Sequence, residues 1–260
     1  MEIREYARTI LESGGLDAKL APPARSLEDR TPGAPLILGL PARDPDIRIR
    51  PGREVKVPAR EGMCDPAQRI RIIHAFANHE LQAVELFAWA LLAFPDAAPE
   101  FRRGLVRILA DEQRHTRMYL KLLSRRSAAF GDFPVSGYFW AKAGEWSSPL
   151  RFIAAMSLTF ECANLDHASD YGGLARKAGD RELADVIEVV HREEIEHVRF
   201  GWTWLNRLKA EGETAWEAYR RSLVWPLRPS RSVGRQFDEL ARTMAGMEPS
   251  FLEALGRETD

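Results

Sequence analysis

Cysteine is scarce in this sequence, and other features that would define a class of function are missing. Its 2 cysteines, Cys64 and Cys162, have no metal-binding spacing and are too few for a disulfide framework. Acidic and basic residues number 38 and 37, so no charge excess favours a nucleic-acid or membrane-surface partner. A Gly-rich dinucleotide signature is also missing. Composition and charge therefore indicate no function, which must be inferred from individual residues and their spacing.

Long apolar runs are missing as well. The longest, LFAWALLAF at 86–94, is far shorter than the ~20 residues that a membrane-spanning helix needs. The opening MEIREYARTI carries acidic residues and lacks the apolar stretch of a secretory signal. We therefore expect a cytoplasmic protein that does not span a membrane.

The N-terminal part differs in composition from the rest. Residues 2–13 have the pattern of a short helix that ends at Gly14 and Gly15. Residues 21–60 contain eight prolines, which exclude a helix and disfavour long strands. Apolar residues are nevertheless interspersed through this segment, which predicts an extended arm packed on the body of the protein.

From Pro66 onward the apolar residues recur with the period of long helices. We expect an all-α protein, a four-helix bundle with one long connection, which forms one domain overall. Its parts are a helix and arm at 1–65, a bundle at 66–212 and extra helices at 213–260. The expected bundle helices span 66–94, 97–129, 149–178 and 180–211.

Glutamate and histidine occur twice as a pair three residues apart. Glu112 and His115 lie in ADEQRHTRMY, and Glu194 and His197 lie in HREEIEH. Residues three apart share one face of a helix, so each pair can point at one place. A single pair of this kind has little specificity, and the argument depends on its partners.

A lone glutamate on the preceding helix accompanies each pair. Glu80 lies 32 residues before Glu112, and Glu161 lies 33 residues before Glu194. The two halves are offset by 81 residues at the lone glutamates and by 82 at the pairs. This is an internal repeat of the pattern.

Four carboxylates and two imidazoles are the ligands that a pair of neighbouring metal ions needs in a helical bundle. Without metal, carboxylates buried between helices would be costly. We predict six metal ligands: Glu80, Glu112, His115, Glu161, Glu194 and His197.

Two other matches compete with this set. Glu85 lies only 27 residues before Glu112 and ~140° around the helix from Glu80, at 100° per residue. We expect Glu85→Ala to lower stability modestly and to leave metal binding intact. Glu188 and His191 form a third Glu-x-x-His, whose offset of 76 breaks the repeat.

His191 has a second interpretation of its own. It lies one turn before Glu194, so it is a candidate to contact a ligand or to serve as an extra one.

Several motifs together resemble a known superfamily. HELQAVELFAWALLAFPDA, DEQRH, FGDFPV and SLTFECANLD resemble the ferritin-like di-iron carboxylate superfamily, in particular a bacterial branch of unknown function related to the tRNA-modifying hydroxylase. The ligand motifs cover about residues 66–211, and the resemblance includes the proline-rich arm. Members with known chemistry include bacterial multicomponent monooxygenases and the small ribonucleotide reductase subunit.

This resemblance implies a centre of two iron ions, with manganese or other divalent metals as alternatives. The first three predicted ligands would bind one ion and the last three the other, with one or two glutamates bridging. DEQRH matches the Asp-Glu-x-Arg-His form of the monooxygenases, whereas EEIEH has Glu193 for Asp and Glu196 for Arg.

Three neighbours of the ligands have two interpretations each. Asp111 and Glu193 either accept the N–H of a metal-bound histidine or are surface charges. Tyr119, four residues after His115, is either a packed core tyrosine or a redox-active group like that of the reductase subunit. Beyond the metal ligands, Tyr119 and His191 are the speculative catalytic residues.

The resemblance implies a non-haem di-metal oxidase or oxygenase that uses dioxygen or peroxide to oxidise an organic substrate. Small residues at Ala154 and Ser157 would leave room for a small molecule or a modified nucleoside. Electrons would come from a separate protein or from the substrate. We expect a monomer or small oligomer. The alternatives are a ferroxidase or iron-handling protein, an RNA-modifying hydroxylase, and a structural protein stapled by metal.

Overall fold

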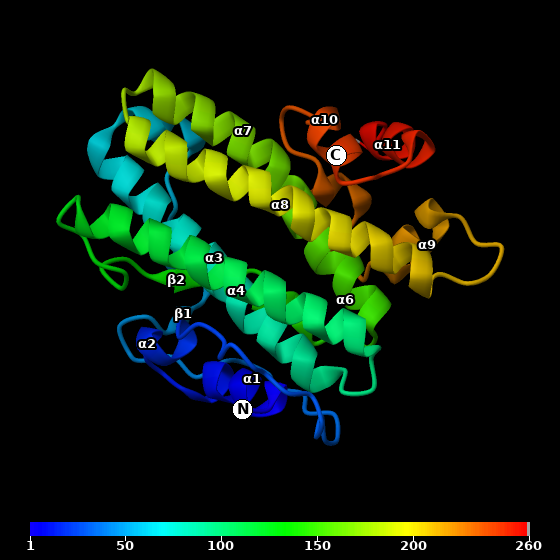
Figure 1. Cartoon of the computed structure of the whole chain (residues 1–260). Helices are drawn as coiled ribbons and strands as arrows, with labels where there is room; N and C mark the ends of the chain where they lie inside the picture. Colours follow the sequence, from blue (N-terminus) through cyan, green and yellow to red (C-terminus); the bar gives the residue numbers. More distant parts are fainter. Residues whose placement is uncertain (259–260) are drawn as a thin grey trace. The chain divides into compact units, whose positions relative to one another are not determined.

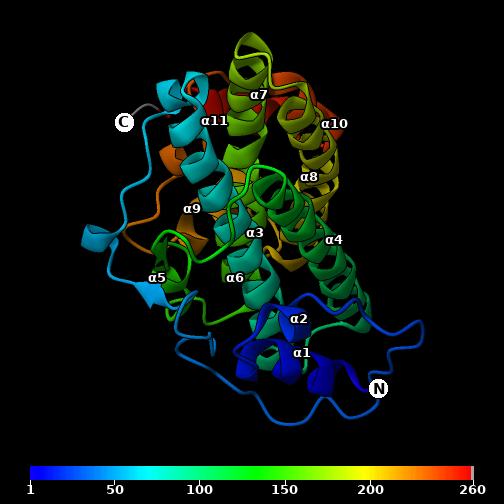
Figure 2. The same ribbon diagram turned by 90° about the vertical axis from the view of Figure 1, so that its left-hand side faces the viewer.

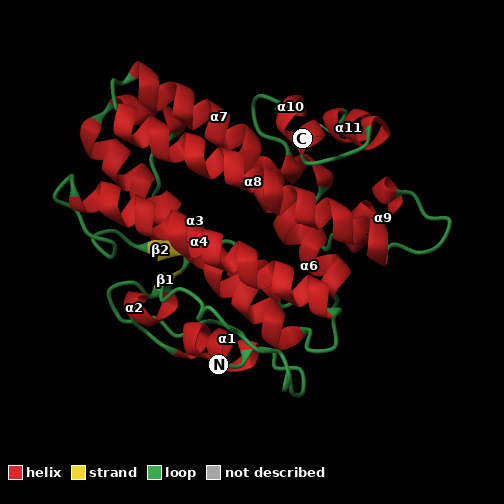
Figure 3. Cartoon of the chain, viewed as in Figure 1, coloured by secondary structure: helices red, strands yellow, loops and turns green. Residues whose placement is uncertain are grey.

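Helices make up most of the chain in the computed structural model, which describes residues 1–258 (Figure 1). The strands in that range are two pieces of two residues each (Figure 3). The predicted all-α class is therefore confirmed. None of the described helices is both long and apolar enough to cross a membrane. The chain divides into two compact units, Met1–Gly144 and Glu145–Asp260.

The first unit is built on a helical hairpin formed by α3 and α4, which pack side by side. Helix α1 also packs on α3, as Figure 2 shows. The short strands β1 and β2 pair in parallel, with Ile49 opposite Val135. The elements are α1 (Ile3–Glu12), α2 (Leu16–Lys19), β1 (Ile49–Arg50), η1 (Gly52–Glu54), η2 (Arg60–Cys64), α3 (Pro66–Ala93), α4 (Pro99–Ser124), β2 (Val135–Ser136) and α5 (Trp140–Ala143).

Local signals set the ends of the two long helices. The Asp65 side chain accepts a hydrogen bond from the backbone N–H of Gln68 and so caps α3, which begins at Pro66 as predicted. Helix α4 ends at Ser124, five residues before the predicted end at 129. Ser127 there adopts a left-handed φ of 54°, and the N–H of Ala128 bonds to the carbonyl of Leu123. This C-terminal motif turns the chain away and ends the helix.

The proline-rich segment lies against α3 and α4. Arg102 on α4 donates two hydrogen bonds to the Asp29 carboxylate, at 2.7 and 2.8 Å. Trp89 on α3 donates from its ring nitrogen to the backbone carbonyl of Leu38 at 3.0 Å. The segment is therefore an extended arm that packs on both helices.

The second unit contains another hairpin, formed by α7 and α8. The helical run 149–177 is interrupted by a π-helical turn, and it agrees with the predicted helix at 149–178. Gly179 then adopts a φ of 75°, and Asp180 caps α8 by accepting from the N–H of Leu183 at 3.1 Å. The elements are α6 (Pro149–Ala155), η3 (Met156–Phe160), α7 (Glu161–Lys177), α8 (Arg181–Leu208), α9 (Ala215–Ser222), η4 (Pro229–Ser232), α10 (Glu239–Met244) and α11 (Pro249–Gly256).

One buried carboxylate anchors the C-terminal segment to α7. Asp166 pairs with Arg242 through two contacts of 2.6 and 2.9 Å, and both side chains are fully buried. Asp166 also accepts from the backbone N–H groups of Gly234 and Asp238, each at 2.7 Å. Four hydrogen bonds satisfy this carboxylate, so the loop before α10 and the helix itself are held to α7.

Candidate metal centre

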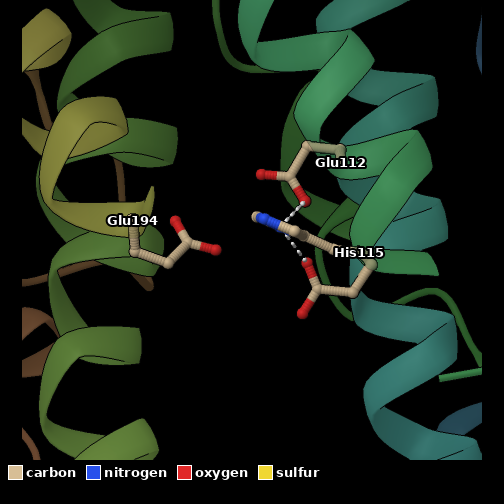
Figure 4. A group of neighbouring side chains, drawn as sticks. Glu112, His115 and Glu194 are labelled. Carbon is tan, nitrogen blue, oxygen red and sulfur yellow. Dashed lines mark ion pairs between the residues drawn. The ribbon is translucent and has the colours of Figure 1, made fainter. Parts of the chain in front are cut away.

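The first unit brings together its three predicted ligands. Glu80 projects from α3, and Glu112 and His115 project from α4, where their spacing of three places them on one face. One ligand atom from each residue lies within 4.8 Å of the others. The Nδ1 atom of His115 is 3.5 Å from a Glu80 oxygen and 3.6 Å from a Glu112 oxygen. Figure 4 shows the Glu112 carboxylate directed at the His115 ring.

These spacings suit a shared metal ion. Two ligand atoms bonded to one ion at about 2.1 Å lie roughly 3.0 to 3.4 Å apart in tetrahedral or octahedral geometry. The observed separations are slightly longer than that, and they exceed the usual length of a direct N–H···O hydrogen bond. The three residues could thus hold one ion at a common point.

The first triad contains two carboxylates and one imidazole, so its own members do not balance its negative charge. Glu80 is only 6% exposed, and Glu112 and His115 are fully buried. Burial raises the pKa of Glu80 well above its usual value, and the nearby Glu112 carboxylate raises it further. A cation bound beside Glu80 and Glu112 would remove this penalty.

The second unit gathers the equivalent three residues. Glu161 at the start of α7 and the pair Glu194 and His197 on α8 each offer a ligand atom within 4.8 Å of the others. Glu194, labelled on α8 in Figure 4, places one carboxylate oxygen 3.1 Å from Nδ1 of His197. All three side chains are buried.

Asn164 is a neighbour of this triad that the sequence interpretation missed. Its side-chain amide donates to the other oxygen of Glu194 at 3.2 Å, leaving the first oxygen directed at His197. Contacts of this kind orient metal ligands. The signal was present in the sequence, because Asn164 follows Glu161 by three residues and therefore shares its face.

A π-helical turn, η3, lies immediately before Glu161. Within it Thr159 donates from its hydroxyl to the carbonyl of Ala154, five residues back, at 2.7 Å. Turns of this type are frequent at functional sites. The turn changes which side chains share a face with Glu161, an effect that the apolar period of the sequence did not predict.

One of the two small residues expected to leave room for a substrate, Ser157, packs closely against a helix. Ser157 faces α8 at Gly201, where a Cβ atom on the glycine would lie only 2.4 Å from that of Ser157. Ala154 and Ser157 are fully buried. The small size of Ser157 therefore allows η3 and α8 to approach closely.

Glu85 belongs to a separate buried network on α3. Arg43 from the arm donates two hydrogen bonds to its carboxylate, at 2.9 and 2.8 Å, and Lys19 lies 3.0 Å away. Trp140 donates a further bond at 3.1 Å. Burial alone would raise the pKa of Glu85, but Arg43 and Lys19 outweigh it and hold the pKa below its usual value.

The third Glu-x-x-His is not part of either triad. His191 lies 3.1 Å from a carboxylate oxygen of Asp238, and the exposed Glu188 pairs with Arg176 at 2.7 Å. Neither belongs to a group of ligand atoms close enough to hold a metal among residues 1–258. The speculative role of His191 as an extra ligand is therefore unsupported.

The other neighbours of the ligands lie as follows. Asp111 pairs with Arg114 at 2.8 Å, with both side chains part-exposed. Glu193 is half-buried on α8. Tyr119 is 3% exposed and contacts Phe76, with ring centroids 5.6 Å apart. These surroundings match the interpretation of Tyr119 as a packed core tyrosine.

The structure thus defines an all-α protein with two buried carboxylate–histidine triads, one in each unit. The chain belongs to the family described as a protein of unknown function (DUF455), whose profile matches residues 7–253. No curated protein and no solved structure matches the chain.

Proposed function

We propose that the protein binds two metal ions, iron by preference, and uses dioxygen or peroxide to oxidise an organic substrate. The proposal takes each triad as the ligands of one ion, as in the di-iron proteins that the sequence resembles. The observation that carries it is the repeat of Glu and Glu-x-x-His as two buried, close-set groups. A structural role alone does not require the same three residue types to recur at the same spacing.

The donor set also favours iron or manganese over other metals. Each triad offers two carboxylates and one imidazole and contains no thiolate. Carboxylate and imidazole ligands suit redox-active iron or manganese, whereas structural zinc sites in proteins are usually rich in cysteine. The raised pKa of Glu80 supports the binding of a cation in general, because the carboxylate needs one to stay ionised in this surrounding.

In this mechanism the residues of the chain would position the metal ions and neutralise their charge. Two metal ions held by the triads would supply the electron-transfer chemistry that reaction with dioxygen or peroxide needs. With metal bound, Glu80 and Glu112 would provide negative charge at buried positions, and His115 would provide a ring nitrogen. Asn164 holds one oxygen of Glu194, which fixes the direction of the other. Rigid helices keep these groups in place.

An optical experiment tests the proposal. The protein is purified without oxygen, loaded with Fe(II) and then exposed to air. New absorption in the near-ultraviolet and visible range is expected from the full chain and not from Glu112→Gln. Absence of bound iron and of any spectral change in the full chain would reject the proposal.

A further inference from the structure

The FGDFPV motif at 130–135 contains none of the metal ligands, yet it builds a second structured site. Its two aromatic rings enclose His74 of α3. Phe130 stacks on the imidazole at 4.8 Å between centroids, and Phe133 meets it edge-on at 5.3 Å. Gly131 adopts a φ of 110° and donates its backbone N–H to Nε2 of His74 at 3.0 Å. The motif therefore fixes the position and tautomer of this histidine.

A cavity of about 30 Å³ opens beside this histidine. It lies within the first unit, between α3, the end of the arm and the FGDFPV motif. A single water needs roughly 10 to 15 Å³ on this scale, so the space suits a group of two or three heavy atoms. Its polar lining comes mainly from Lys56, Arg71, His74, Asn78 and His79.

Two hydrogen-bond donors at this cavity have no acceptor among residues 1–258. Since Nε2 of His74 accepts from Gly131, the neutral ring carries its proton on Nδ1. Burial lowers the pKa of His74 to about 4, against the opposing effect of Asp132, so the ring is neutral near pH 7. Arg71 bonds through Nη2 to the carbonyl of Lys56 at 2.7 Å, but its buried Nε–H has no partner. A buried donor without a partner, such as Nε–H of Arg71, is rare and calls for a ligand.

The charge around the cavity favours an acceptor of negative charge. None of the described residues that line it is acidic, whereas Lys56 and Arg71 are cationic. The carboxylate of Asp132, which acts on the charge of His74, accepts a bond from the N–H of Ala129 at 2.7 Å. Asn78 is satisfied through Arg43 and Ser136. Arg71 and His74, which carry the two donors, therefore both line a cavity of positive charge.

We propose that this cavity binds the carboxylate group of a small organic acid. One carboxylate oxygen would accept from Nε–H of Arg71 and the other from Nδ1–H of His74. A planar group with two acceptor oxygens matches two separate donors, and its size fits the cavity. The site uses neither triad, so its test does not depend on whether the protein binds metal.

Formate is the probe for this site. Sodium formate is titrated into the full chain, with sodium chloride at matched ionic strength as the reference. The ring nitrogens of His74 are followed by ¹⁵N NMR, and affinity is measured by calorimetry. Saturable binding with a dissociation constant of about 1 mM is expected for so small a ligand, with a change at Nδ1 of His74. Phosphate, which is larger and tetrahedral, should bind more weakly.

Three variants show where formate binds. Arg71→Gln should weaken binding about tenfold, because it removes a charged donor. Arg69→Gln, two residues away on the same helix, is the control and should bind as the unchanged protein does. Ala75→Leu fills the cavity while leaving both donors in place, and it decides the outcome if Arg71→Gln fails to fold. A response to chloride equal to that for formate, or full binding by Ala75→Leu, would overturn the proposal.

Discussion

Glu80 and Glu85 lie on the same helix and are both buried, yet their surroundings carry opposite charge. Glu80 faces another carboxylate and a histidine, and its pKa is raised by burial and by Glu112. Glu85 faces Arg43 and Lys19, which hold its pKa down. The two positions therefore serve different purposes, and the same substitution separates them.

Glu80→Gln and Glu85→Gln form a matched pair. Glu80→Gln should lose bound metal while leaving the metal-free protein as stable or more stable, because a neutral amide replaces a poorly compensated carboxylate. Glu85→Gln should keep the metal but lower the free energy of unfolding by about 3 to 5 kcal/mol, since two buried cations lose their partner. The sequence alone suggested a modest loss at Glu85, and the buried network predicts a larger one. Urea unfolding and metal analysis on both variants measure this, and interchanged results would contradict the assignment.

His74 should make stability depend on pH. Its pKa is about 4 in the folded protein against about 6.5 in the unfolded chain, so the unfolded chain binds a proton first as pH falls. The stabilisation is complete above pH ~6.5 and is lost down to pH ~4, by up to about 3 kcal/mol.

The measurement compares unfolding in urea at several pH values for the unchanged protein and for His74→Gln. Glutamine keeps an acceptor for Gly131 and does not titrate, so the variant should lose less stability over this range. Parallel curves would show that His74 is not the cause.

The starts of two helices could be predicted from the sequence, because the signals for them, a capping residue followed by proline, are local. Asp65 with Pro66, and Ser148 with Pro149, mark starts that the structure reproduces. Less predictable features depend on geometry or distance. Helix α4 ended early because Ser127 adopts a left-handed backbone conformation. The π-helical turn η3 could not be predicted from the spacing of apolar residues.

The candidate site also has features that the sequence predicts and features that it does not. Spacing alone predicted which residues gather in the two triads, because residues on one helix face follow from helix geometry. The ion partners of Glu85 were not predictable, since Lys19 and Arg43 are brought to it by the path of the arm.

Close packing between η3 and α8 gives a prediction for an element. Gly201→Ala would place its methyl group 2.4 Å from Cβ of Ser157, so it should lower the free energy of unfolding by about 1 to 3 kcal/mol. Gly173 in α7 has open space at the same position, and Gly173→Ala should stabilise by about 0.5 to 1 kcal/mol. Urea unfolding of the two variants tests the packing. Equal effects would show that η3 and α8 are not in close contact.

For the whole molecule, the main choice lies between an oxidising enzyme and an iron-storage protein. The arm covers α3 and α4 through contacts such as Arg102 with Asp29, which favours a discrete protein over a cage subunit. Aerobic loading with excess Fe(II) should therefore stop near two irons per chain, in a monomer or small oligomer. Iron analysis with light scattering measures this. A large cage with a mineral core would make storage the better account.

The central claim is that the two Glu and Glu-x-x-His sets bind a pair of metals. Its most direct test is the metal content, by elemental analysis, of the protein and of the double variant Glu112→Ala, His115→Ala. The double variant Glu188→Ala, His191→Ala, which removes the Glu-x-x-His that lies outside the triads, is the control. We predict about two metals per chain in the protein and in the control, and loss of most of the metal from the first double variant. Full metal content in the Glu112→Ala, His115→Ala protein would contradict the account.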